Sequence, residues 1–120
     1  MTVKMRTKYG TIDINKNAIA TVVGGAATDN YGVVGMASRN QIRDNVNVIL
    51  RRQNYSRGIE VHQNQSGISI DVYIIVSYGT KISEISKSVQ AKAKYNLKEM
   101  LGLTPESINV IVQGVQVLDN

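Results

Sequence analysis

Hydrophobic and polar positions alternate along several short stretches of the chain, a pattern typical of β-strands with one covered face. The longest alternation covers residues 68–78. Its apolar positions are Ile68, Ile70, Val72, Ile74, Val76 and Tyr78. Ser69, Asp71, Tyr73 and Ser77 occupy the opposite face, where Ile75 is the apolar exception. We therefore expect a long strand whose apolar face is the buried centre of a sheet, with shorter strands at 7–14, 33–37, 59–63 and 108–118.

Three other stretches have the three-to-four-residue period of amphipathic helices. The first follows Asn15 as N-cap and places Ile19, Val22, Val23 and Ala26 on one face. The second follows Asn40 and uses Ile42, Val46, Ile49 and Leu50. The third covers residues 81–101, ends at Gly102, and has a stripe of Ile82, Ile85, Val89, Ala93, Leu97 and Met100. Thr104, Pro105 and Glu106 carry the residue types that begin one further helical turn.

Two turn signals connect these elements. Residues 64–67, Asn-Gln-Ser-Gly, predict a hairpin between the strands at 59–63 and 68–78. The apolar phase of the last strand shifts at Gln113-Gly114, which predicts a β-bulge at Gly114. The expected order is β-α-β-α-β-β-α-β, an α/β sandwich with one mainly antiparallel sheet covered by helices. With no linker-like tract, residues 1–120 are expected to form a single domain.

Composition excludes several kinds of site. The 120 residues include no cysteine, so disulfides, iron–sulfur clusters and thiolate metal sites are excluded. His62 is the single histidine and, by alternation with Ile59 and Val61, should face solvent. No segment has the apolar length of a signal peptide or a membrane span, so we expect a soluble intracellular protein.

The candidate chemistry is sparse. No glycine-rich nucleotide-binding motif is present. The carboxylates Glu60, Asp71, Glu84 and Asp44 are scattered along the chain, with no spacing that indicates acid–base catalysis or a metal-ligand cluster. We therefore expect no catalytic residues, no cofactor and no metal, and interpret the chain as a non-enzyme.

Two features offer candidate binding sites. Gly79, Thr80 and Lys81 lie where a strand leads into a helix, a corner that can hold an anion or can be simply a tight turn with Thr80 as N-cap. On the third helix, Lys87, Lys94 and Lys98 fall within about 40° of one another, off the apolar stripe. They form either a partner-binding face or a solvated helix surface.

The charge distribution is uneven. Residues 1–57 contain nine Lys or Arg and three Asp or Glu, whereas residues 58–120 contain five and six, within a formal net charge of +5. Arg39, Arg43, Arg51, Arg52 and Arg57 surround the second predicted helix. A basic chain of pI about 9.6 with mixed α/β order leaves a small RNA-binding domain as an alternative function.

Five segments have a characteristic order and spacing: YGTIDI (9–14), GGAA (24–27), YGVVGMA (31–37), VSYGTKI (76–82) and INVIVQGV (108–115). In this order and spacing they resemble the alkaline shock protein family of Gram-positive bacteria, also called envelope stress response proteins, and in particular its short, YloU-like branch. Together they span nearly the whole chain, about residues 8–117.

The resemblance implies a small cytoplasmic α/β protein without known enzymatic activity. It further implies a role in cell-envelope homeostasis and, as in some members, a position at the inner face of the membrane through an integral membrane protein partner. It supplies no catalytic residues. Because a scaffold presents several contacts, we also expect self-association through the less covered sheet face, where Tyr73 and Ile75 lie.

Overall fold

The computed structural model describes residues 2–37 and 57–117. Its elements are β1 (Thr2–Thr7), β2 (Gly10–Asn15), α1 (Lys16–Thr28), β3 (Val33–Met36), β4 (Ile59–Asn64), β5 (Gly67–Ser77), α3 (Ile82–Leu101) and β6 (Ser107–Gln116). The mixed α/β class and the expected order of elements are confirmed. The predicted helix that Asn40 begins, together with Arg39, Arg43, Arg51 and Arg52, lies outside the described residues.

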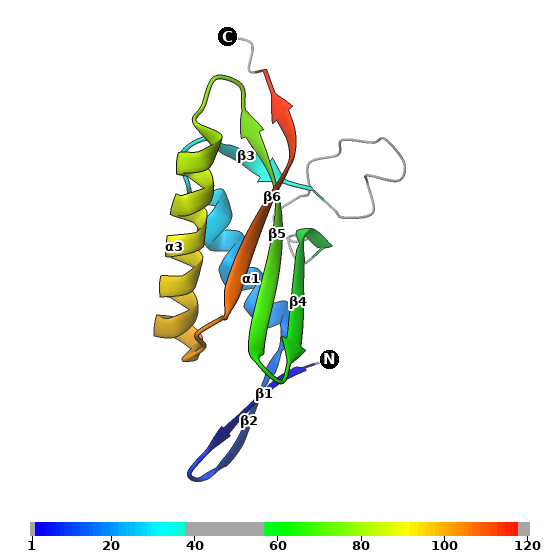
Figure 1. Cartoon of the computed structure of the whole chain (residues 1–120), viewed down its shortest axis with the longest axis vertical. Helices are drawn as coiled ribbons and strands as arrows, with labels where there is room; N and C mark the ends of the chain where they lie inside the picture. The colour runs from blue at the N-terminus through cyan, green and yellow to red at the C-terminus, as the bar shows by residue number, and fades with distance from the viewer. Residues whose placement is uncertain (1, 38–56, 118–120) are drawn as a thin grey trace.

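β5 is the central strand of the main sheet. Along one edge it pairs antiparallel with β4 over its first half and with β3 near its end. Along the other edge it pairs parallel with β6. Two of its three pairings are antiparallel, as expected. Helices α1 and α3 cover one face, α1 beneath β4 and α3 beneath β6, so the molecule has two layers (Figure 1).

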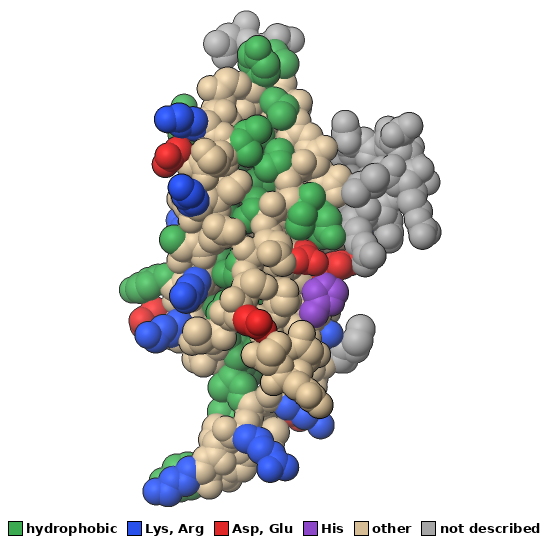
Figure 2. Space-filling view, viewed as in Figure 1, with side chains coloured by type: hydrophobic (Ala, Val, Ile, Leu, Met, Phe, Trp, Pro, Cys, Tyr) green, Lys and Arg blue, Asp and Glu red, His purple; other side chains and the backbone are tan. Residues whose placement is uncertain are grey.

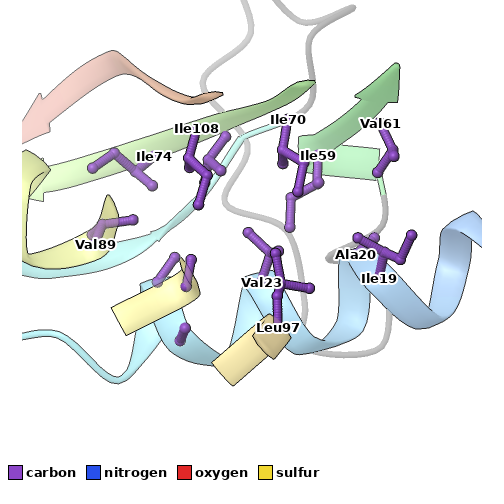
Figure 3. Packing of buried hydrophobic residues seen from close by; sticks show 14 of the residues in the cluster. Ile19, Ala20, Val23, Ile59, Val61, Ile70, Ile74, Val89, Leu97 and Ile108 are labelled. Carbon is purple, nitrogen blue, oxygen red and sulfur yellow. The ribbon is translucent and has the colours of Figure 1, made fainter. Parts of the chain in front are cut away.

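The core lies between the sheet and the two helices. The expected alternation of β5 is confirmed for Ile70, Val72, Ile74 and Val76, whose side chains are fully buried or nearly so. They meet Ile19 and Val23 of α1 and the α3 stripe of Ile85, Val89, Ala93 and Leu97 (Figure 3). Tyr78 follows the strand and is 74% exposed, so its expected place in the apolar face is wrong.

The N-terminal strand differs from the prediction for residues 7–14. Thr7 ends a separate strand β1, Lys8 and Tyr9 form the turn, and β2 begins at Gly10. This second, two-stranded sheet projects from the body (Figure 1). Asn15 caps α1 as predicted, since its side-chain Oδ1 accepts a hydrogen bond from the backbone N–H of Asn17 at 2.7 Å.

The hairpin of β4 and β5 has the predicted turn. Asn64 Oδ1 accepts hydrogen bonds from the backbone N–H groups of Ser66 and Gly67, at 2.9 and 3.1 Å. Gly67 has φ +143°, a conformation that favours glycine. The turn fixes the cross-strand register Asn64↔Gly67, and therefore every later pair of the two strands.

The predicted bulge in β6 is also confirmed. Ile74 pairs with Val112 and Ile75 with Gly114, so Gln113 is the additional residue. The expected helical turn at Thr104–Glu106 is wrong. Pro105 is buried, and the backbone N–H of Glu106 donates to the carbonyl oxygen of Ile68 at 2.7 Å, which brings the chain directly into β6.

Candidate interaction surface

Helix α3 presents a basic face defined by Lys87, Lys94 and Lys98, which we call the α3 lysine face. All three side chains are exposed, and the helix buries the opposite stripe. They extend over about 16 Å of helix at 1.5 Å per residue. Within residues 2–37 and 57–117, none of their ammonium groups has an ion-pair partner. Figure 2 shows basic side chains along this edge, with carboxylates between them.

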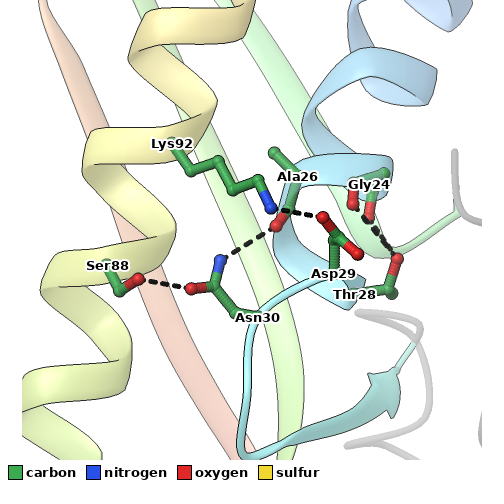
Figure 4. A network of polar contacts seen from close by, with 8 residues as sticks. Gly24, Ala26, Thr28, Asp29, Asn30, Ser88 and Lys92 are labelled. Atoms are coloured by element: carbon green, nitrogen blue, oxygen red, sulfur yellow. Dashed lines mark hydrogen bonds and ion pairs between the residues drawn. The ribbon is translucent and has the colours of Figure 1, made fainter.

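Lys92 of the same helix has a different role, because it joins α3 to α1. Its Nζ donates to Asp29 Oδ2, immediately after α1 (Figure 4). That hydrogen bond, with the positive charge of Lys92, holds the pKa of Asp29 below its ordinary value of 3.8. Ser88 Oγ also donates to Asn30 Oδ1, and Asn30 Nδ2 donates to the carbonyl oxygen of Ala26 at 2.9 Å.

These contacts fix the orientation of the α3 lysine face. Two side chains of α3, Ser88 and Lys92, bond to the segment that ends α1, and four α3 residues are buried against the core. A pocket of about 300 Å³ opens between α3 and β6, lined by Lys94, Gln90 and residues 105–109. Lys94 is therefore at the rim of a depression, where a partner could contact helix and strand together.

The corner at Gly79–Lys81 is a turn in which Thr80 is not the helix cap. Thr80 Oγ1 donates to the carbonyl oxygen of Ser77 at 2.6 Å, and Lys81 is the N-cap residue without a side-chain cap bond. Glu84 places a carboxylate in the first helical turn, which disfavours a bound anion. Lys81 is exposed, and an anion site at this corner stays a prediction.

The apolar stripe of α3 is shorter than predicted. Ile82 and Met100, at its two ends, are 41% and 67% exposed. The buried part of the helix therefore runs from Ile85 to Leu97.

The sheet face turned away from the helices is covered more than its sequence suggested. Tyr73 and Ile75 are only 8% and 5% exposed, although they do not belong to the main core. Both side chains are therefore buried, although this face as a whole is less covered than the helix-facing one, because Ser69, Asp71 and Ser77 on it are only half-buried. Exposed apolar side chains gather instead where β5 and β6 end, at Tyr78, Val115 and Val117.

The same sheet face brings together three side chains that the sequence analysis treated as scattered or solitary. His62 is exposed, as predicted, and its Nε2 lies 3.5 Å from Glu60 Oε2 and 3.3 Å from Asp71 Oδ2. These three residues, which we call the His62 cluster, form a group with ligand atoms within 4.8 Å of one another. Counting pairs back from the Asn64–Gly67 turn would have found them, because Glu60 pairs directly with Asp71.

Comparison with known proteins gives a consistent family assignment. The model of the alkaline shock protein 23 family, described as having a cell envelope-related function, matches residues 4–117. The chain is 56% identical to the uncharacterized protein YloU of Bacillus subtilis over 117 residues, 98% of each chain. It is 52% identical to the uncharacterized protein Spy1614 of Streptococcus pyogenes serotype M6 over 118 residues, again 98% of each. The uncharacterized protein YqhY of Bacillus subtilis is 31% identical over 110 residues, 92% of this chain and 80% of YqhY.

No solved structure gives a significant match. In the part of the chain that the structure describes, no helix has the length and apolar character needed to cross a membrane.

Proposed function

We propose that this chain, which belongs to the alkaline shock protein 23 family of cell envelope-related function, is a non-enzymatic interaction protein at the cytoplasmic face of the membrane. The alkaline shock resemblance and the envelope relation are confirmed by the family match and by relatives over nearly the full chain. In this proposal a membrane protein holds the chain there and contacts the α3 lysine face through an acidic segment.

The α3 lysine face is the observation that carries this proposal. Lys87, Lys94 and Lys98 are three exposed ammonium groups without ion-pair partners among the described residues, on a helix fixed by Lys92 and Ser88. Because the helix is already fixed, this chain loses little conformational entropy on binding, and the three positive charges together attract one acidic segment. Near an anionic membrane each lysine adds about 1 kcal/mol, so three lysines alone bind weakly. The protein partner supplies the remaining affinity.

A triple charge reversal tests the proposal. Lys87→Glu, Lys94→Glu and Lys98→Glu together should leave the fold intact, because all three side chains are exposed. The membrane-bound fraction in cells, compared at equal expression, should fall several-fold. Circular dichroism and the melting temperature of the purified variant check the fold.

The matched control reverses three exposed basic residues of the projecting hairpin, Lys4, Arg6 and Lys8. Its change in net charge equals that of the triple α3 variant. The control should keep the wild-type membrane-bound fraction. If the membrane-bound fraction falls equally in both variants, the effect comes from net charge. If it is unchanged in both, the α3 lysine face is only a solvated surface. Either result contradicts the proposal. Release of the wild-type protein by nuclease would instead favour the RNA-binding alternative.

A further inference from the structure

We propose that the His62 cluster is a binding site for a divalent transition-metal ion, with Zn²⁺ as its best match. Its protein ligands are His62 Nε2, Asp71 Oδ2 and Glu60 Oε2. The site lies on the sheet face and shares no residue with the α3 lysine face. In Figure 2 the histidine and its neighbouring carboxylates lie on the right of the view, and the lysines along α3 lie on the left.

The spacing of the three groups follows from the strands that carry them. Glu60 and His62 are alternate residues of β4 and point to the same face, and Asp71 is the cross-strand partner of Glu60 on β5. Two atoms bound at about 2.1 Å to a tetrahedral ion are about 3.4 Å apart. The distances from His62 Nε2 to Asp71 Oδ2 and Glu60 Oε2 are 3.3 and 3.5 Å. These two separations match the tetrahedral value, and the two carboxylate oxygens lie within 4.8 Å of each other, so rotation of the side chains is enough to place all three atoms around one ion.

A fourth side chain orients one of the ligands. Asn109 is the partner of Asp71 on β6, and its Nδ2 donates to Asp71 Oδ1 at 2.8 Å. This hydrogen bond fixes the carboxylate with Oδ2 toward His62. Metal-binding carboxylates and imidazoles commonly have such outer partners, which hold the ligand in its binding orientation. Asn109 is thus a positioning residue of the proposed site.

The charges and the ligand types favour a transition metal. Glu60 and Asp71 face each other on paired strands, so a cation bound there contacts two carboxylates as well as the imidazole. An imidazole nitrogen is a poor ligand for Mg²⁺ and Ca²⁺ and a good one for Zn²⁺. The histidine side chain is 53% exposed, which leaves room for a fourth ligand from solvent. Three protein ligands with one open position are typical of zinc sites that bind a further group.

Zinc titration of the untagged full chain, after treatment with EDTA, tests the site. A histidine tag would bind zinc itself and must be absent. Since His62 is the single histidine, its imidazole NMR signals report on one residue only. We expect Zn²⁺ to shift these signals and to bind with a stoichiometry of one by calorimetry. Mg²⁺ at the same concentration should leave them unchanged.

Variants separate the site from adventitious binding to surface carboxylates. His62→Asn and Asp71→Asn should each weaken zinc binding by at least about 100-fold, and Asn109→Ala by about 10-fold. Glu106→Gln, a charge-matched control for Asp71→Asn, should bind as the wild type does. Melting curves without zinc establish that each variant is folded. Imidazole signals that stay unmoved in excess zinc, or equal zinc affinity in wild type and His62→Asn, would overturn the proposal.

Discussion

Truncation of Ile74 should remove a large part of the stability of the fold. Ile74 is fully buried, pairs with Met36 on β3 and Val112 on β6, and belongs to the core beneath both helices. Ile74→Ala removes three carbon atoms, which at about 0.8 kcal/mol each gives a transfer loss of about 2.4 kcal/mol. The cavity left in a close-packed core adds to this, so we expect a loss of about 3–4 kcal/mol. That is a large fraction of the roughly 5–15 kcal/mol typical of a domain.

Urea unfolding followed by circular dichroism measures this loss as a lower midpoint at an unchanged slope. Ile12→Ala is the matched control, because Ile12 is 46% exposed on the projecting hairpin and should lose less than about 1 kcal/mol. Ile74→Asp buries a carboxylate without a partner and should leave too little native protein to measure a transition. A loss below about 1 kcal/mol for Ile74→Ala, or equal losses at positions 74 and 12, would show that the core is placed on the wrong face.

Two further predictions concern glycines and the bond between the helices. Gly25→Ala should stabilise the protein by about 0.5–1 kcal/mol, because Gly25 is exposed inside α1 and a Cβ there meets nothing within 4 Å. Gly32→Ala should destabilise it by more than about 1 kcal/mol, since its φ is +91° and the new Cβ would lie 2.5 Å from Ile85 Cδ1; urea midpoints that move in the same direction for both variants would contradict this reasoning. The pKa of Asp29 is lower in the folded state than its ordinary value of 3.8, so its ionised carboxylate stabilises the fold. This contribution is fully present above about pH 3.8 and is lost as the pH falls through the folded-state pKa. Asp29→Asn should therefore flatten the acid limb of the curve of stability against pH, and an unchanged limb would contradict the assignment to Lys92.

Much of the architecture follows from periodicity in the sequence. Three features were predictable in this way: the β5 alternation, the α3 stripe from Ile85 to Leu97 and the Asn64–Gly67 turn. In each of them several neighbouring residues indicate the same local structure. The phase shift at Gly114 was sufficient to place the bulge. Such features are predictable because burial on one face imposes one period on a whole element.

The errors arise where a local signal competes with tertiary contacts. Thr104-Pro105-Glu106 has the composition of a helix start, but the hydrogen bond from Glu106 to Ile68 draws the segment into the sheet. Thr80 was expected to cap α3, yet its hydroxyl bonds back to Ser77. The strand Thr2–Thr7 has only Val3 and Met5 in alternation, too short a run to stand out.

The candidate sites were predictable to different degrees. Exposure of Lys87, Lys94 and Lys98 follows from helical geometry alone. The unpaired state of their ammonium groups among the described residues, in contrast to the pairing of Lys92 with Asp29, depends on how α1 and α3 pack. The His62 cluster depends on the register of β4 and β5, and the orientation of Asp71 depends on the parallel pairing with β6. The spacing of residues along the chain does not reveal that Asp71 lies beside Asn109 of β6.

Site-specific photocrosslinking in cells tests the central claim most directly. A photoreactive amino acid at position 94, on the α3 lysine face, is compared with one at position 8, at the tip of the hairpin; both side chains are exposed. We expect a crosslink at position 94 to an integral membrane protein with an acidic segment on its cytoplasmic side, and no such product at position 8. Equal crosslinking to that protein at both positions, or crosslinks from position 94 to RNA alone, would contradict the account.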